Sequence, residues 1–115
     1  ILGDVEMIES TLISYITADY KTKSDMKVGM MEWQNIIQEM TPRFKKAGAL
    51  RQTASQVWNK EGVFRLGYTW EYRDEKAFVE CQGLFREAES LFDKRTEIIR
   101  KVFANRGVIL EDIVF

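Results

Sequence analysis

A stretch with strict two-residue alternation most constrains what this chain can fold into. One set of alternate positions within residues 63–72 carries large apolar and aromatic side chains, namely Phe64, Leu66, Tyr68, Trp70 and Tyr72. The intervening positions are mostly small or polar: Val63, Arg65, Gly67, Thr69 and Glu71. Because successive side chains of a strand point to opposite faces of its sheet, this pattern predicts a strand with one buried face and one face of mixed polarity.

A second pattern, with helical spacing, precedes this strand. Apolar residues recur at intervals of four and three positions, at Met26, Met30, Trp33, Ile37, Met40, Phe44 and Ala47. Such a stripe is typical of a helix with one face toward a core. Ser24 and Asp25 are suitable N-cap residues, and Gly48 is a suitable stop. We expect Gly29 to delay the start of this helix and Pro42 to kink it.

Strands are expected on both sides of this helix. β-Branched and aromatic residues favour a strand over 15–22, whereas 4–13 fit either a strand or a helix. A second strand is expected over 50–59, and the hairpin-like sequence 59–62 joins it to the alternating strand at 63–72.

The remaining sequence predicts further helix and a last strand. A short helix capped by Asp74 and interrupted at Gly83 is expected first. Its inward residues are Ala77, Phe78 and Cys81. The inward residues of a longer helix follow at Leu84, Ala88, Leu91, Phe92, Ile98, Ile99, Val102 and Phe103. We expect this helix to stop at 105–107, before a strand over 108–115.

The order strand, helix, strand, strand, helix, strand predicts a ferredoxin-like α+β fold. In this βαββαβ arrangement a four-stranded antiparallel sheet carries both helices on one face. Residues 1–115 are expected to form one domain, with 1–13 as an N-terminal extension of uncertain structure. The open face of the sheet would carry Arg65, Thr69 and Glu71 on a surface that is partly apolar. We therefore expect a homodimer in which a second copy covers this face.

Charge and composition exclude several kinds of partner. The chain has 115 residues with 17 basic and 18 acidic side chains and a net charge of −1 at pH 7, so we expect no nucleic-acid partner. No apolar run approaches the roughly 20 residues of a membrane span, so we expect no membrane partner. The basic residues cluster at Arg43, Lys45 and Lys46 and at Arg100, Lys101 and Arg106. Both clusters are interpreted as helix C-termini, where positive charge is favourable.

Residue counts also restrict the chemistry. The sequence contains no histidine, which excludes Ser-His-Asp and Cys-His catalytic systems, histidine-ligated zinc and a haem with a proximal histidine. The single cysteine, Cys81, forms no intramolecular disulfide, which suits a reducing compartment such as the cytoplasm, and we expect it to be buried and inert. No dinucleotide-binding or P-loop glycine motif is present, and we expect neither a cofactor nor a metal.

The sequence around the alternating strand resembles a known superfamily. Residues 62–78 read Gly-Val-Phe-Arg-Leu-Gly-Tyr-Thr-Trp-Glu-Tyr-Arg-Asp-Glu-Lys-Ala-Phe. A tryptophan near the strand end, an acidic turn and an Ala-Phe pair are similar to the third strand and following helix of dimeric α/β-barrel proteins. That superfamily includes antibiotic-biosynthesis monooxygenases and haem-degrading IsdG-like, EthD-like and NIPSNAP-like proteins. The resemblance covers about residues 14–115 and implies a dimeric barrel, but a fold alone does not define a reaction.

The same resemblance argues against haem degradation. IsdG-like proteins use an asparagine on the first strand, a tryptophan on the third strand and a histidine on the second helix. The tryptophan matches Trp70, whereas Tyr20 and Glu89 stand near the other two positions. Two of the three groups are therefore replaced.

An aromatic-lined pocket between sheet and helices is the candidate site. Trp70, Tyr68, Tyr20 and Trp33 could border it or simply fill the core. Glu89 follows the inward Ala88 and could lie at the pocket edge, or it could be solvated and paired with Arg86 on the same helix.

Three functions remain open at this point. The first is a binding or accessory protein for a small apolar or aromatic molecule. The second is a cofactor-free monooxygenase or isomerase that uses Glu89 or Tyr20 as acid or base. The third is a structural role for the dimer alone, which a completely filled core would favour.

Overall fold

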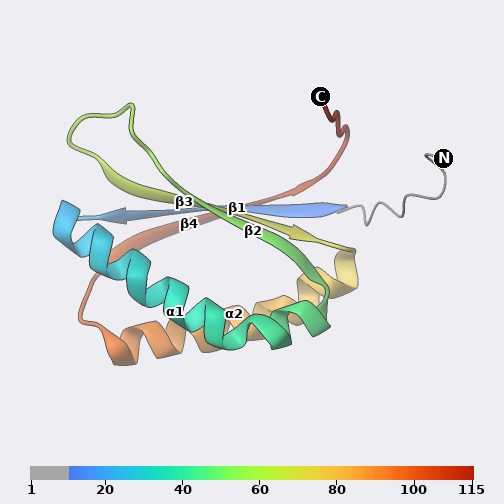
Figure 1. Cartoon of the computed structure of the whole chain (residues 1–115), viewed down its shortest axis with the longest axis horizontal. Coiled ribbons are helices and arrows are strands. Elements are labelled where there is room, and N and C mark those ends of the chain that lie inside the picture. The colour runs from blue at the N-terminus through green and yellow to red at the C-terminus, as the bar shows by residue number, and fades with distance from the viewer. Residues whose placement is uncertain (1–10) are drawn as a thin grey trace.

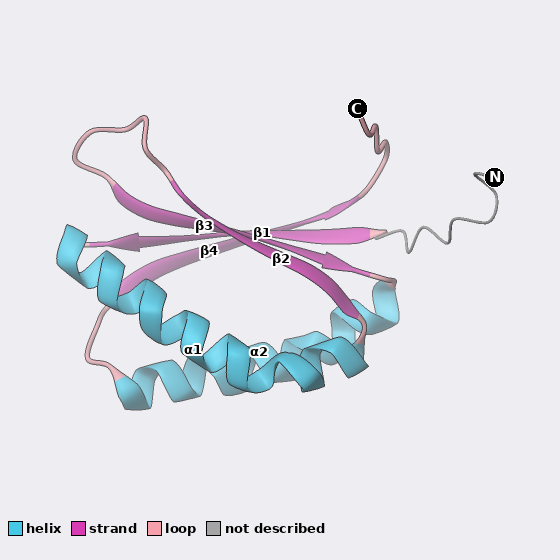
Figure 2. Cartoon of the chain, in the orientation of Figure 1, coloured by secondary structure: helices cyan, strands magenta, loops and turns pink. Residues whose placement is uncertain are grey.

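A four-stranded antiparallel sheet with two helices on one face makes up the computed structural model, which describes residues 11–115 (Figure 1). The elements in chain order are β1 (Leu12–Tyr20), α1 (Lys23–Ala47), β2 (Ala49–Gln56), β3 (Phe64–Tyr72), α2 (Glu75–Arg95) and β4 (Arg100–Val108). The strands are ordered β2-β3-β1-β4, and both helices lie on the same side of the sheet (Figure 2). The predicted ferredoxin-like βαββαβ fold is confirmed.

The alternation in β3 is the feature that the sequence predicts best. Leu66, Tyr68, Trp70 and Tyr72 are all buried beneath the helices, as expected. On the other face, the register with β1 sets Arg65 opposite Asp19, Thr69 opposite Tyr15 and Glu71 opposite Ile13. The expected dimer-face residues therefore share the sheet face that the helices leave open.

Helix α1 begins earlier and runs more continuously than the sequence suggests. Its N-cap is Thr22, whose hydroxyl accepts a hydrogen bond from the Asp25 backbone N–H at 3.0 Å, so the expected caps Ser24 and Asp25 were wrong. The helix continues through Gly29 and Pro42, and ends as predicted at Gly48, where φ is 105°. Gly29 does not delay the helix. It allows close packing, because a Cβ there would lie 2.6 Å from the Tyr20 ring.

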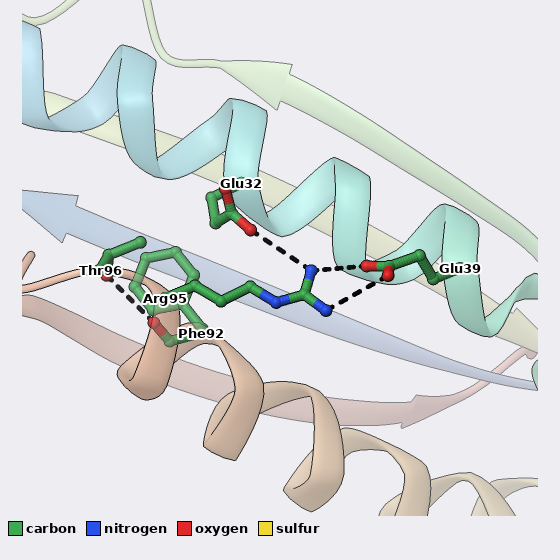
Figure 3. Close-up of polar contacts among 5 residues, drawn as sticks. All are labelled: Glu32, Glu39, Phe92, Arg95 and Thr96. Carbon is green, nitrogen blue, oxygen red and sulfur yellow. Dashed lines mark hydrogen bonds and ion pairs between the residues drawn. The ribbon is translucent and has the colours of Figure 1, made fainter.

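The largest error in the sequence-based prediction concerns the C-terminal third. Helix α2 is not interrupted at Gly83, and it ends at Arg95 rather than after Phe103. Thr96 caps it, with its hydroxyl donating to the Phe92 carbonyl at 3.1 Å (Figure 3). Residues 100–108 form β4 and pair with β1 throughout, so the expected strand over 108–115 was also wrong.

The basic cluster at Arg100, Lys101 and Arg106 consequently lies on β4 and not at a helix C-terminus. By contrast, Lys45 and Lys46 do lie in the last turn of α1. The two strands that flank α1 also differ slightly from expectation, since β1 begins at Leu12 and β2 ends at Gln56. The part of the predicted N-terminal extension that precedes residue 11 lies outside the described residues.

Ion pairs connect the two helices on their outer side. The Arg95 guanidinium of α2 reaches Glu39 at 2.5 Å and Glu32 at 3.4 Å on α1 (Figure 3). Arg43 of α1 pairs with Glu87 of α2 at 2.6 Å, although both side chains are about half-exposed. Exposed pairs of this kind contribute little to stability, because solvent and salt screen the charges. Within residues 11–115, no helix is long and apolar enough to cross a membrane.

Candidate functional site

A cavity of about 160 Å³ lies between the sheet and α2. Its floor consists of buried residues on the helix-facing side of β1 and β3, namely Ser14, Ala18, Tyr68, Trp70 and Tyr72. Gln82, Phe85 and Glu89 of α2 and Trp33 of α1 form the opposite wall. The three α2 residues are spaced by three and four, which brings them to one face of that helix.

The remaining wall is β4, and it forms the mouth of the cavity. Arg100, Val102, Ala104 and Arg106 alternate along this strand and all line the cavity. Val102 is 43% exposed, and Ala104 and Arg106 are exposed too, although all three face the helix side of the sheet. Since β4 is an edge strand, its outer half opens the cavity to solvent.

Two aromatic side chains in the floor carry buried polar atoms that lack a partner. The Tyr68 hydroxyl and the Trp70 indole Nε1 are inaccessible to solvent and make no hydrogen bond within residues 11–115. The neighbouring Tyr72 hydroxyl differs, because it accepts a hydrogen bond from the Ser14 hydroxyl at 3.1 Å. An unsatisfied buried polar group costs about 1–3 kcal/mol, so these two atoms are the least favourable polar groups among the lining residues.

Ring contacts hold Trp70 in place. Its ring centroid lies 4.7 Å from that of Phe85, nearly edge-on, and 4.8 Å from that of Phe44 in a tilted arrangement. These contacts join β3 to both helices. The orientation of the Trp70 ring is therefore set by packing against Phe44 and Phe85.

A buried arginine stands at one end of the cavity. The Arg100 side chain is only 6% exposed, and its guanidinium lies 4.7 Å from the Trp33 ring and 3.8 Å from the Phe92 ring. Its Nη2 donates to both carboxylate oxygens of Glu89, at 3.0 and 3.1 Å, and its Nη1 donates to the Tyr20 hydroxyl at 3.4 Å. Burial lowers the pKa of Arg100, but Glu89 and Tyr20 outweigh that effect and raise it, so the charge is permanent.

The comparisons with known proteins identify a family. The model of the family described as "Domain of unknown function (DUF6974)" matches residues 9–109. The chain belongs to this family. No curated protein sequence matches it.

Solved structures resemble this DUF6974 chain in fold. A dimeric ferredoxin-like protein from an uncultured marine organism is 22% identical with a TM-score of 0.77, over 91% of this chain and 100% of that one. A Streptomyces coelicolor monooxygenase from the gene ActVA-Orf6, in complex with Nanaomycin D, is 12% identical with a TM-score of 0.62, over 96% and 97%. SnoaB, a cofactor-independent oxygenase from Streptomyces nogalater, is 9% identical with a TM-score of 0.60, over 90% and 98%. These likenesses confirm the resemblance in fold inferred from residues 62–78.

The structure brings most of the candidate site residues of this DUF6974 chain together. Trp70, Tyr68, Trp33 and Glu89 line one cavity. Tyr20 is not part of the lining, but it contacts the site through Arg100. The alternative in which Glu89 pairs with Arg86 was wrong about the partner, since the partner is Arg100 on β4.

Among the polar lining residues, the sequence reasoning missed Arg100, Arg106, Ser14 and Gln82. The alternation of Arg100, Val102, Ala104 and Arg106 was a usable signal, but the preceding apolar residues fitted helical spacing and concealed it. Cys81, which was expected to be buried and inert, does not line the cavity. Cys81 is fully buried, and burial raises the pKa of its thiol to about 11. In the described part of the chain, no cluster of three or more His, Cys, Asp or Glu could hold a metal ion.

Proposed function

We propose that this chain binds a small, largely apolar organic molecule in the cavity between its sheet and α2. The observation that carries this proposal is that two residues lining the cavity, Tyr68 and Trp70, each hold a buried donor without a partner among residues 11–115. A purely structural dimer would gain stability by filling this space with apolar side chains, so the cavity supports a binding role. A volume of about 160 Å³ suits one aromatic ring, since a closed apolar cavity of about 150 Å³ is enough to hold benzene.

The tryptophans offer a direct test of binding. Trp33 and Trp70 line the cavity, whereas Trp58 is 90% exposed and serves as an internal reference. Titration with a set of one-ring and two-ring phenols, ketones and carboxylates should move the indole N–H resonances of Trp70 and Trp33 and leave that of Trp58 in place. Equal movement of all three, or of none with any compound, would contradict the proposal.

A variant that closes the mouth provides the matched control. Ala104→Phe adds a ring at the exposed edge of the cavity without burying a polar group. It should weaken binding of every compound that binds the wild type. Val79→Phe, at a 61% exposed position on α2 outside the lining, adds a similar ring and should leave binding unchanged.

The protein is further proposed to act as a homodimer that packs through the open sheet face. That face exposes the apolar surfaces of Tyr15 and Phe103, which are 49% and 56% accessible. A related fold is that of a dimeric ferredoxin-like protein, which supports the same arrangement. Phe103→Asp should convert a dimer to a monomer in sedimentation equilibrium, and Val79→Asp should not. A wild type that is already monomeric at micromolar concentration would refute the dimer.

A cofactor-free oxygenase is the second candidate. It is favoured by the folds of a monooxygenase and a cofactor-independent oxygenase, which resemble this chain along most of its length. In this role Glu89 or Tyr20, both bonded to Arg100, would act as the acid or base. Oxygen consumption with each compound that binds decides between the two roles, because a pure binding protein leaves dissolved oxygen constant.

A further inference from the structure

The charges around the cavity define what kind of molecule can occupy it. Among the lining residues, all of which belong to the described part of the chain, the charged side chains are Arg100, Arg106 and Glu89. The two arginines lie six positions apart on one face of β4, a separation of about 20 Å at roughly 3.3 Å per residue. Val102 and Ala104 lie between them at the mouth. Two positive charges and one negative charge therefore border the cavity.

Arg100 has hydrogen-bonding capacity that its present partners do not use. A guanidinium carries five N–H donors. Tyr20 accepts from Nη1 and Glu89 accepts from Nη2, while Nε makes no bond with any residue from 11 to 115. The rings of Trp33 and Phe92 fix the plane of the guanidinium, so these donors keep a set direction.

Two further residues that line the cavity carry unpaired groups of the same polarity. The indole N–H of Trp70 can only donate, and the Tyr68 hydroxyl is also available as a donor. Burial raises the pKa of the Tyr68 hydroxyl, which therefore remains protonated at neutral pH. A ligand that satisfies this site must present acceptor oxygens, and a buried positive charge nearby favours acceptors that are ionised.

We infer that the ligand is an aromatic molecule with an anionic oxygen group, a carboxylate or a phenolate, and that Arg100 binds this group. The inference rests on the proposed binding function and names the ligand class of the same cavity. Glu89 is the counter-ion of Arg100 in this structure. Its side chain is 43% exposed, so it can release part of its contact to water when the ligand anion arrives.

Benzoate and benzamide test the charge requirement with one ring and nearly one shape. Benzoate should bind the wild type at least about tenfold more tightly, which corresponds to about 1.4 kcal/mol. The Trp70 indole N–H resonance reports both titrations. Equal affinities would overturn the inference and leave the binding function standing. The inference also fails if benzoate and phenols do not bind while aromatic ketones do, and absence of binding by any aromatic compound would overturn both proposals.

Two substitutions with opposite expected signs test the assignment to Arg100. Arg100→Gln should weaken benzoate binding by about tenfold or more and change benzamide binding little. Glu89→Gln removes the competing charge but keeps an amide oxygen for Arg100 to contact, so benzoate should bind about threefold more tightly or better. This second variant keeps the test decisive if Arg100→Gln does not fold, because Glu89 is partly exposed.

Matched controls come from the ion pair on the outer side of the helices. Arg43→Gln and Glu87→Gln make the same changes in net charge, and Glu87 lies on the same helix as Glu89. Neither control should alter benzoate affinity by more than about twofold, since exposed charges are screened. An effect of Glu87→Gln equal to that of Glu89→Gln would show a general charge effect and overturn the assignment.

Discussion

The two helices cover the same face of the sheet in different ways. Helix α1 buries long side chains, including Met26, Ile36, Ile37, Met40 and Phe44. The buried residues of α2 are mostly small, namely Ala77, Cys81 and Ala88, with Phe92 near its end. The cavity lies beneath α2 and continues onto β4, whose helix-facing residues stay partly exposed. The site thus arises where inward side chains are short and an edge strand is incompletely covered.

The same substitution, isoleucine to alanine, should lower the free energy of unfolding by different amounts under α1 and beside the cavity. Ile36 of α1 is 0% exposed, whereas Ile16 of β1 is partly buried and lines the cavity. Ile36→Ala should reduce the free energy of unfolding by about 2–5 kcal/mol, because it opens a new hole in a filled core. Ile16→Ala should cost about 1–2 kcal/mol, because space already adjoins it. Equal losses in urea denaturation would contradict the contrast between a closely packed position and one that borders the cavity.

The junction of the two regions depends on Gly48. Its φ is 105°, and an added Cβ would lie 2.5 Å from the Cβ of Ala77 at the start of α2. Gly48→Ala should therefore lower stability by about 2–4 kcal/mol, from backbone strain and overpacking together. Gly62 also has a positive φ, 76°, but an added Cβ would meet no atom of residues 11–115 within 4 Å.

Gly62→Ala is the control that isolates the backbone contribution of this change. It should cost about 1–2 kcal/mol, the strain of a left-handed conformation alone. Thermal or urea unfolding of both variants measures the difference. If the two variants lose the same stability, close packing of Gly48 on Ala77 is not important.

The same contrast explains which parts could be predicted from sequence. The period of two in β3 and the stripe in α1 come from side chains buried on one side of a regular element, so neighbouring residues contain the whole signal. For β4 the local signal was misleading, since Ile98, Ile99, Val102 and Phe103 also fit helical spacing. What decides the strand is pairing with β1, for example of Val102 with Ala18, and local periodicity contains no such information.

The residues of the candidate site show the same difference between local patterns and contacts that form only in the folded chain. Tyr68 and Trp70 were found because they share the alternating strand, and Glu89 because it adjoins a helical stripe. Arg100 was missed because its role depends on residues of β1, α1 and α2, which surround it only after the strand has paired. Thr96, which ends α2, was the nearest local sign that the helix stops early.

Two tyrosines in the cavity floor differ in whether their hydroxyl groups are satisfied. Tyr72→Phe removes the acceptor of the Ser14 hydroxyl, which is buried with Ser14 only 3% exposed. We expect a loss of about 1–2 kcal/mol in the free energy of unfolding. The double variant Ser14→Ala with Tyr72→Phe should recover part of that loss, because no unpaired hydroxyl remains. Strict additivity of the two single changes would argue against the hydrogen bond.

Tyr68→Phe should have the smallest effect on stability and a clear effect on binding. The hydroxyl that it removes is buried and has no partner within residues 11–115, so the free energy of unfolding should change by less than about 0.5 kcal/mol or rise. Aromatic ligands with acceptor oxygens should bind more weakly, because one of the free donors in the floor is lost. A stability loss as large as that of Tyr72→Phe would mean that the Tyr68 hydroxyl has a hydrogen-bond partner in solution without any added ligand.

The stability of Tyr68→Phe and of the wild type at alkaline pH provides a second, independent test of whether the Tyr68 hydroxyl is buried. Burial raises the pKa of Tyr68 above its usual value of 10.0, so between that pH and the folded-state pKa the unfolded chain loses a proton that the folded chain keeps. The contribution of the buried, protonated Tyr68 to the free energy of unfolding is therefore complete below pH 10, and it falls as the pH rises further. Tyr68→Phe removes this contribution, so its free energy of unfolding should decline less steeply than that of the wild type between pH 9.5 and about 11. Parallel declines in urea denaturation across that range would mean that the Tyr68 hydroxyl is accessible to water, and the floor of the cavity would then be wetter than its burial indicates.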